Sequence, residues 1–275
     1  VLVSPVFIQT GGTVMAFNPG DILPVQYNMT YVLASYAVSV MGSLMALYHA
    51  GNIRRRDGTV DRGMVLGAAV SLGGVGIWSM HFIGMLGYRL PVPVVYGGLL
   101  TFASLLAAVL ISGVALWLAG GQGKFSTGGW LLGSILAGAG VCVMHYGGMY
   151  AMRLNADPSF NLSLVAVSVL IAITAAAAAL WIVFNVRKAA YRLVAAFVMG
   201  LAVCAMHYTG MAAADFVCTA SKAASAWTIG GAYLPTLVFA TVALVMVLLL
   251  WNLLGRMFEV AAAVPIKQSR LGAKF

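Results

Sequence analysis

One six-residue motif, Met-His-x-x-Gly-Met, occurs three times in the chain and brings together side chains that can bind a metal. Its histidines are His81, His145 and His207. Methionine makes up only 15 of 275 residues, so six matched methionines are not an accident of composition. Imidazole nitrogen together with thioether sulfur is a ligand set that suits copper. The methionines are Met80, Met144 and Met206 directly before the histidines, and Met85, Met149 and Met211 four residues after them.

Helical geometry places most of these donors on one side of a helix. At about 100° per residue, the methionine four residues after each histidine lies about 40° from it around the helix. The methionine directly before the histidine lies about 100° away, so its side chain must turn to reach the same site. Cys142 and Cys204, each three residues before a histidine, lie about 60° away and are possible secondary ligands. The glycine three residues after each histidine lets a neighbouring helix or a ligand approach closely.

The composition indicates that these motifs lie in a membrane protein. The chain is 62% hydrophobic and 8% charged, whereas a soluble domain typically has about 25% charged residues. Such a chain cannot cover its surface with polar groups, so we expect a lipid bilayer to be its main solvent. The net charge of +9 does not indicate a nucleic-acid partner, because the basic residues flank apolar segments and form no stripe with interleaved aromatic residues.

Seven apolar segments are long enough to cross about 30 Å of hydrocarbon, which takes about 20 residues each. Polar and glycine-rich breaks separate them, such as the arginine run at residues 54–56. The sequence therefore predicts an all-α integral membrane protein with seven transmembrane helices. The predicted spans are residues 27–49, 64–87, 94–118, 130–152, 162–184, 193–214 and 232–254.

The distribution of basic residues predicts the orientation. With the N-terminus outside, the outer segments hold only Arg89, Arg153 and Lys222. The inner segments hold twelve: Arg54, Arg55, Arg56, Arg62, Lys124, Arg187, Lys188, Arg192, Arg256, Lys267, Arg270 and Lys274. This asymmetry predicts an N-out, C-in arrangement. The expected regions are an extracytoplasmic tail (1–26), a seven-helix membrane domain (27–254) and a cytoplasmic basic tail (255–275).

The repeat is expected to bring the three histidines together. They are 64 and 62 residues apart, which is two spans, so the unit is a two-helix hairpin repeated three times. All three motif helices then run in the same direction, with the motif about 10 Å below the outer interface. Parallel repeats are commonly related by an axis along the membrane normal, so we expect one layer of histidines in the bundle interior. His49 lies outside the motifs, and we expect it at the membrane interface.

Copper suits this donor set better than zinc or haem. Zinc sites more often include thiolate or carboxylate ligands, and the motifs contain no carboxylate. Haem would use histidine and methionine as axial ligands. A purely structural interpretation also exists, because an intramembrane histidine can simply bond a neighbouring helix and methionine often fills cores. Three identical sets at one depth favour a functional site, as ionisable groups inside membranes usually do.

The motifs resemble the signature of the MHYT-domain family, which are bacterial integral membrane sensor domains. Met206-His207-Tyr208-Thr209 carries the signature in full, whereas Met144-His145-Tyr146-Gly147 differs at the fourth position. Met80-His81-Phe82-Ile83 differs at the third and fourth, so any role of a phenol rests on Tyr146 and Tyr208, which are possible secondary ligands. The resemblance covers essentially residues 27–254.

What the resemblance implies is a domain of the bacterial cytoplasmic (inner) membrane that binds copper through its Met and His residues near the outer face. It implies sensing of oxygen, carbon monoxide or nitric oxide. Family members often carry cytoplasmic diguanylate cyclase, phosphodiesterase or DNA-binding output domains. We expect none within these 275 residues, so any output requires a cytoplasmic signalling partner or residues beyond them.

The leading hypothesis is therefore a copper-dependent membrane sensor of a diatomic gas or of redox state. One alternative is a copper transporter or metallochaperone, which would need donor atoms deeper in the bundle. Another is a haem- or copper-containing membrane oxidoreductase. We expect no enzyme activity, because the chain shows no catalytic constellation other than the possible metal site.

Overall fold

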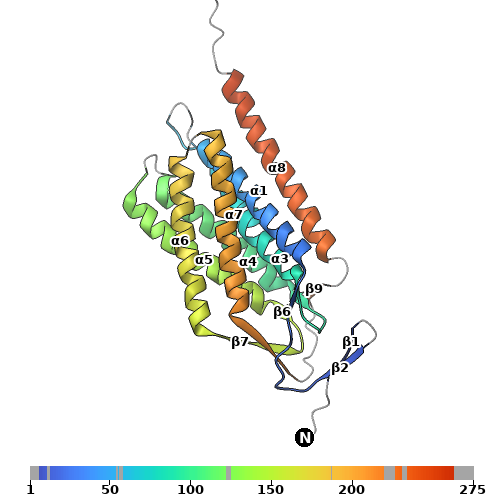
Figure 1. Cartoon of the computed structure of the whole chain (residues 1–275). Helices are drawn as coiled ribbons and strands as arrows, with labels where there is room; N and C mark the ends of the chain where they lie inside the picture. Colours follow the sequence, from blue (N-terminus) through green and yellow to red (C-terminus); the bar gives the residue numbers. More distant parts are fainter. Residues whose placement is uncertain are drawn as a thin grey trace, which may run out of the picture.

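The structure is a computed structural model of the chain, and it describes residues 6–10, 13–53, 55, 58–121, 125–186, 188–219, 227–230 and 234–262. Seven helices in this part are long and apolar enough to cross a membrane, which confirms the predicted fold class (Figure 1). Large apolar side chains such as Leu110, Leu170 and Leu201 are exposed on the outside of the bundle. Many exposed apolar side chains are expected of a surface that faces lipid.

The helices agree with the predicted spans to within a few residues at most ends. The second span is composite, since a π-helix, η1, separates two α-helices, and the third span ends in a short π-turn, η2 (Trp117–Gly121). The helices are α1 (Met29–Gly51), α2 (Arg62–Ala69), η1 (Val70–Ser79), α3 (Met80–Gly87), α4 (Gly98–Leu116), α5 (Thr127–Tyr150), α6 (Leu162–Asn185), α7 (Ala189–Ala212) and α8 (Leu234–Ala262).

Polar side chains fix where several of these helices begin. Asn28 accepts a hydrogen bond from the backbone of Thr30 at the start of α1, and Asn161 caps α6 in the same way. Asp61 accepts from two backbone N–H groups at the start of α2, and Ser126 from one at the start of α5. These oxygens pair helix N–H groups that would otherwise have no partner within the helix.

Six of the spans form a closed ring. Each of α1, the second span, α4, α5, α6 and α7 packs on the next, and α7 packs back on α1. The seventh helix, α8, lies outside this ring against the second span and α1 (Figure 1). The three motif helices are α3, α5 and α7, so they alternate around the ring with α1, α4 and α6.

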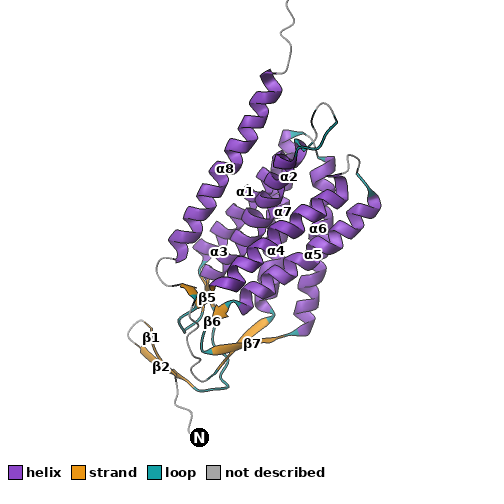
Figure 2. Ribbon diagram, turned by 180° about the vertical axis from the view of Figure 1, so that it is seen from behind, coloured by secondary structure: helices purple, strands orange, loops and turns teal. Residues whose placement is uncertain are grey.

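Short strands lie at one end of the bundle (Figure 2). Their pairing marks the beginning and the end of three repeat units in the ring. In each unit the strand before the first helix pairs with the strand after the second helix. Unit 1 comprises residues 26–89, unit 2 residues 95–153 and unit 3 residues 156–218. The closing pairs are β3 (Gln26–Tyr27) with β4 (Tyr88–Arg89), β5 (Val95–Gly97) with β6 (Met152–Arg153), and β7 (Ala156–Phe160) with β8 (Ala214–Cys218).

These pairs confirm the predicted hairpin repeat, but the strands themselves are not among the predicted elements. The paired segments are two to five residues long, which is too short for alternation to show. A further strand, β9 (Thr228–Gly230), pairs with β5. At the N-terminus β1 (Val6–Thr10) and β2 (Thr13–Phe17) form a hairpin. Gly20 and Leu23 then donate backbone hydrogen bonds to β8, which ties this segment to the strand-bearing end.

The orientation of the bundle stays a prediction, because no membrane accompanies the structure. Of the basic residues on which it rests, Arg54, Arg56, Lys124, Arg187, Lys222, Lys267, Arg270 and Lys274 lie outside the described residues. The described ones divide as expected. Arg89 and Arg153 lie in strands at the strand-bearing end, whereas Arg62, Arg192 and Arg256 lie toward the opposite end. The predicted tail from residue 255 begins as the last turns of α8, and residues 263–275 lie outside the described part.

The structure corrects the prediction that His49 is interfacial. Its side chain is fully buried, and its Nδ1 lies 2.9 Å from the carbonyl oxygen of Met45. Gly67 of α2 makes the burial possible, because a Cβ at that position would collide with the imidazole. The position in the last turn of α1 is as predicted, but neighbouring helices pack against that turn and cover the imidazole.

Close helix contacts in the ring depend on particular glycines, and Gly42 gives a sharp test. A Cβ on Gly42 would lie closer than 3.0 Å to backbone atoms of η1, so we expect Gly42→Ala to destabilise the protein by about 1–3 kcal/mol. Gly147 has nothing within 4 Å of its Cβ position, so Gly147→Ala is expected to be neutral or stabilising by about 1 kcal/mol at most. Thermal unfolding in detergent compares the two, and equal effects would contradict the packing described.

Candidate metal centre

The three motif histidines meet in the middle of the ring. His81 comes from α3, His145 from α5 and His207 from α7, each five or six residues before the last residue of its helix. At 1.5 Å per residue this depth is about 8 Å from the strand-bearing end. The three histidines therefore converge at one depth in the bundle, as predicted. Each repeat unit contributes one imidazole.

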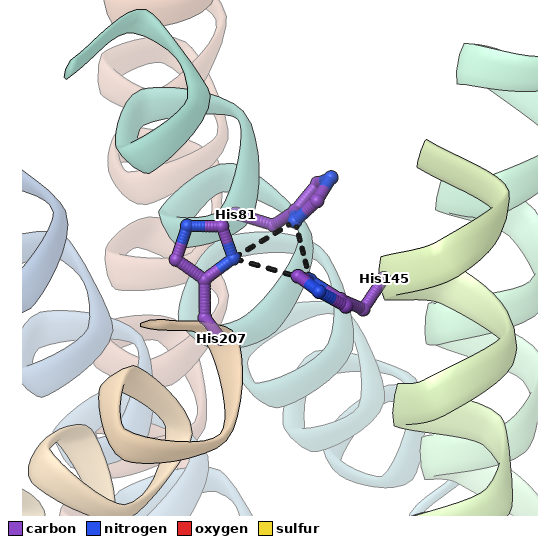
Figure 3. Close-up of side chains that lie close together, drawn as sticks. All are labelled: His81, His145 and His207. Carbon is purple, nitrogen blue, oxygen red and sulfur yellow. Dashed lines mark hydrogen bonds between the residues drawn. The ribbon is translucent and has the colours of Figure 1, made fainter. Parts of the chain in front are cut away.

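The Nδ1 atoms of the three rings form a nearly equilateral triangle (Figure 3). The Nδ1–Nδ1 distance is 3.1 Å between His81 and His207. It is 3.2 Å for each of the other two pairs. The rings stand nearly perpendicular to one another, with interplanar angles of 81–89°. Of the described residues, these three are the group of His, Cys, Asp and Glu side chains that is close enough to hold one metal ion.

Each imidazole also packs against a glycine of the next unit. The glycine is the one three residues after the histidine in the neighbouring motif, and a Cβ there would lie closer than 3.0 Å to an imidazole Nε2. The motif glycine therefore serves a neighbouring helix, as predicted. The pairs follow one direction around the ring: His81 on Gly148, His145 on Gly210, and His207 on Gly84.

The three Nδ1 atoms cannot satisfy one another by hydrogen bonds alone. A ring nitrogen carries either a hydrogen or a lone pair. With three atoms and two states, at least two neighbours are in the same state, and the contact between them is repulsive. The three side chains are at most 1% exposed, so the repulsion is not relieved by bulk water. A cation that accepts three lone pairs removes it.

The triangle has dimensions that fit a metal ion. Metal–nitrogen bonds of about 2.0–2.1 Å at tetrahedral angles place the ligand nitrogens about 3.3–3.4 Å apart. The observed separations of 3.1–3.2 Å are close to this spacing. Each Nε2 is buried without a hydrogen-bond partner. An ion bound by the Nδ1 lone pairs would leave the hydrogen of each neutral imidazole on Nε2. The donor set therefore fits the group that the sequence predicts.

The six motif methionines are all buried, with at most 2% exposure. Met206 packs in a small cluster with Cys142 and Ala172. Burial is consistent with both ligation and packing, so their place as ligands stays a prediction. The thiols of Cys142 and Cys204 are free and buried, and they do not join the histidine group.

The hydroxyl groups of the two motif tyrosines are bonded to serines of the next unit. Tyr146 bonds Ser168 at 2.7 Å, and Tyr208 bonds Ser35 at 3.0 Å. At the first junction, between units 1 and 2, Phe82 has no hydroxyl, and the indole Nε1 of Trp78 donates to Ser104 at 3.0 Å instead. The phenols thus point toward neighbouring helices and join the units.

The three serines are not among the predicted site residues, although the sequence contains a signal for two of them. Ser104 and Ser168 each lie 23 residues after a motif histidine. Each donates to the carbonyl three residues earlier in its own helix, and Ser35 does the same. A serine that recurs at a fixed distance after a motif histidine, inside an apolar span, is a recognisable sequence pattern. Ser35 does not show this pattern, because no motif precedes it in the chain.

Comparison with known proteins identifies the repeat. The family "Bacterial signalling protein N terminal repeat", MHYT, matches residues 74–130, 138–196 and 200–257. Each match runs from a motif helix into the helix that follows it. In these family repeats α8 follows the third motif helix, as α4 and α6 follow the first and second. In the ring, however, the place next to α7 is filled by α1.

Relatives of known classification are signalling proteins. The chain is 38% identical over 244 residues to the bifunctional diguanylate cyclase/cyclic di-GMP phosphodiesterase MucR of Pseudomonas aeruginosa, covering 86% of this chain and 35% of that protein. It is 41% identical to the cyclic di-GMP phosphodiesterase NbdA of the same organism over 51% of this chain and 18% of that protein. The signaling protein YkoW of Bacillus subtilis is 32% identical over 70% and 24%. No solved structure matches.

The tyrosine–serine bonds between units can be tested by removing one hydroxyl. We expect Tyr146→Phe to lower the free energy of unfolding by about 0.5–1.5 kcal/mol, because it removes one partly buried hydrogen bond to Ser168. Tyr150→Phe is the control, since Tyr150 lies on the same helix and is exposed. Chemical denaturation in detergent gives both values, and an equal loss for the two variants would show that the bond contributes nothing.

Proposed function

Because this chain belongs to the MHYT family of bacterial signalling proteins, whose repeats match it three times, we propose that it is a copper-binding membrane sensor domain. The signal is a diatomic gas, O2, CO or NO, or the redox state. Its seven apolar helices and its relatives identify it as a multi-pass bacterial membrane protein with a role in signalling. The observation that carries the copper proposal is the convergence of three buried Nδ1 atoms that cannot satisfy one another.

The histidines are the proposed ligands, through Nδ1. The motif methionines around them offer soft sulfur, which favours copper over zinc. Copper supplies a centre that changes oxidation state and accepts a small neutral ligand. The ligand set proposed is His81, His145 and His207 with Met85, Met149 and Met211, and with Met80, Met144 and Met206 nearby.

The surrounding residues prepare this centre. Apolar helices exclude bulk water from the imidazoles, which strengthens every electrostatic interaction there. The motif glycines set the position of each ring against the next helix. The tyrosine–serine and tryptophan–serine bonds hold the motif helices against α1, α4 and α6.

A signal can leave the centre through the packing between units. Each histidine belongs to one unit and rests on a glycine of the next, so a small movement of an imidazole changes an interface. The π-helix η1 ends at Ser79, two residues before His81, and such segments often mark functional sites. The helix α8 packs on this same span. We propose that α8 carries the change to a signalling domain or partner on the side of its C-terminal end.

A path for copper through the bundle finds less support. A cavity in the bundle interior reaches Met206, and its walls carry no histidine, cysteine or acidic side chain. Ser112 is its one hydroxyl-bearing side chain. Such walls give a copper ion few donor atoms, although they suit a small apolar molecule.

Metal binding tests the proposal directly. After loading with Cu(I) we expect one copper per chain by elemental analysis, and loss of this copper in His145→Ala. Gly148→Ala places a methyl group against the His81 ring and is expected to weaken copper binding by about 10–100-fold, as loss of ligand positioning does. Gly147→Ala, one residue earlier and open, is the control. A wild-type protein without bound metal, or equal affinities for the two glycine variants, would refute the site.

The ligand of the centre can be tested by spectroscopy. We expect the Cu(I)-loaded protein under CO to show a bound C–O stretching band in the infrared that His207→Ala removes. Retention of the band in the variant would place the gas elsewhere. A Soret band in the purified protein would indicate haem, and copper uptake by proteoliposomes would indicate transport. Either result would replace the sensor proposal.

A further inference from the structure

A cavity of about 150 Å³ lies at the junction of units 1 and 2, and none of the three motif histidines lines it. The second span, α4 and α8 form its walls, together with β5 and β9. Three of its side chains are aromatic and two are threonines. Its lining residues are Trp78, Phe82, Tyr96, Thr101, Ile229, Val238 and Thr241.

The residues of this junction depart from those of the other two junctions. Trp78 stands three residues before its histidine, where units 2 and 3 have cysteines. Phe82 stands where they have Tyr146 and Tyr208. Thr101, three residues before Ser104, corresponds to Val165 and Val32, which precede Ser168 and Ser35 in the same way. In the described part of the chain α8 packs on the second span and α1, and its residues Val238 and Thr241 line the cavity at this junction.

The most informative side chain of this cavity is Thr101, because its hydroxyl has no hydrogen-bond partner. Its Oγ1 is buried and forms no hydrogen bond. Its carbonyl oxygen already accepts from Trp78 and Ser104. An unsatisfied buried hydroxyl is unfavourable by about 1–3 kcal/mol, and valine of the same shape avoids this cost at the other two junctions. Thr101 lines the cavity, and a ligand oxygen would meet its hydroxyl after a change of the χ1 rotamer.

The size and walls of the cavity specify a flat ring. A protein cavity of about 150 Å³ lined by apolar side chains holds a benzene molecule. The rings of Trp78, Phe82 and Tyr96 lie in series, with centroids 4.7 and 5.6 Å apart, and aromatic walls favour stacked or edge-on aromatic guests. Thr101 adds one donor for a ring oxygen. An acyl chain of a lipid would leave this donor without a partner.

We propose that this cavity binds the headgroup of a membrane-soluble quinone or quinol. The ring packs among the three aromatic side chains, and one of its oxygens bonds the Thr101 hydroxyl. The isoprenoid tail leaves toward the lipid beside α8, where Thr241 and Phe239 are exposed. Phe82 separates the site from the centre, because its ring lies edge-on to His81 at 4.9 Å. The occupant touches both the ring of helices and α8. The proposal does not rest on copper.

Binding of decylubiquinone to the full chain in nanodiscs tests the proposal, with tryptophan fluorescence as the readout. We expect Thr101→Val to weaken binding by about five- to tenfold, the loss of one hydrogen bond, and Val238→Trp to abolish binding by filling the cavity. Val165→Thr, the reverse change at the next junction, is the matched control and is expected to leave the affinity unchanged.

Three outcomes would overturn the proposal. Equal affinity of Thr101→Val and wild type would show that the hydroxyl does not contact the ring. Binding retained in a folded Val238→Trp would place the quinone elsewhere. An acyl lipid bound at this cavity by native mass spectrometry, insensitive to Thr101→Val, would identify the occupant as lipid. Thermal unfolding verifies that each variant is folded. If Val238→Trp does not fold, Thr101→Val still tests the proposal, because it keeps the shape of the side chain.

Discussion

Three imidazole nitrogens at 3.1–3.2 Å from one another, inside an apolar bundle, are the constraint around which this protein is built. No assignment of hydrogens makes all three contacts favourable, so the packing of the helices must hold the rings in place. It does so because each ring occupies the space that a glycine leaves on the next motif helix. The histidine and the glycine three residues later are therefore one interlocking element, repeated around an axis. Substituting the glycine disturbs a histidine of a different unit.

The junction between units 1 and 2 departs from the threefold symmetry of the ring. Two junctions use a phenol and a serine, whereas the first uses the indole of Trp78 to reach Ser104. The exchange keeps a hydrogen bond between the units while it removes a hydroxyl at Phe82 and leaves one without a partner at Thr101. The same unit contains the π-helix η1, with Ser79 bonded five residues back to Gly74. Units 2 and 3 have regular motif helices. Divergence is concentrated where α8 packs.

Sequence reasoning finds the parts of this fold that rest on long or repeated patterns. Seven apolar segments, the hairpin repeat and the meeting of His81, His145 and His207 all follow from span length and spacing. Short or non-local features do not. The closing strands have as few as two residues, and the closure of the ring by α1 joins helices far apart in the chain. The burial of His49 depends on Gly67 of another helix. Periodicity within one segment contains no information about such partners.

The closure by α1 explains why α8 differs from every other helix. Six helices complete the threefold ring, so the second helix of the third family repeat finds its place occupied and packs outside. Its contacts are therefore not fixed by the symmetry that fixes the others. At one end it covers the aromatic cavity of the first junction. At the other, Arg256 lies 3.4 Å from Asp61, which caps α2 and also pairs with Arg55. Because α8 contacts the second span near both ends, a displacement of that span, which carries His81, would also displace α8.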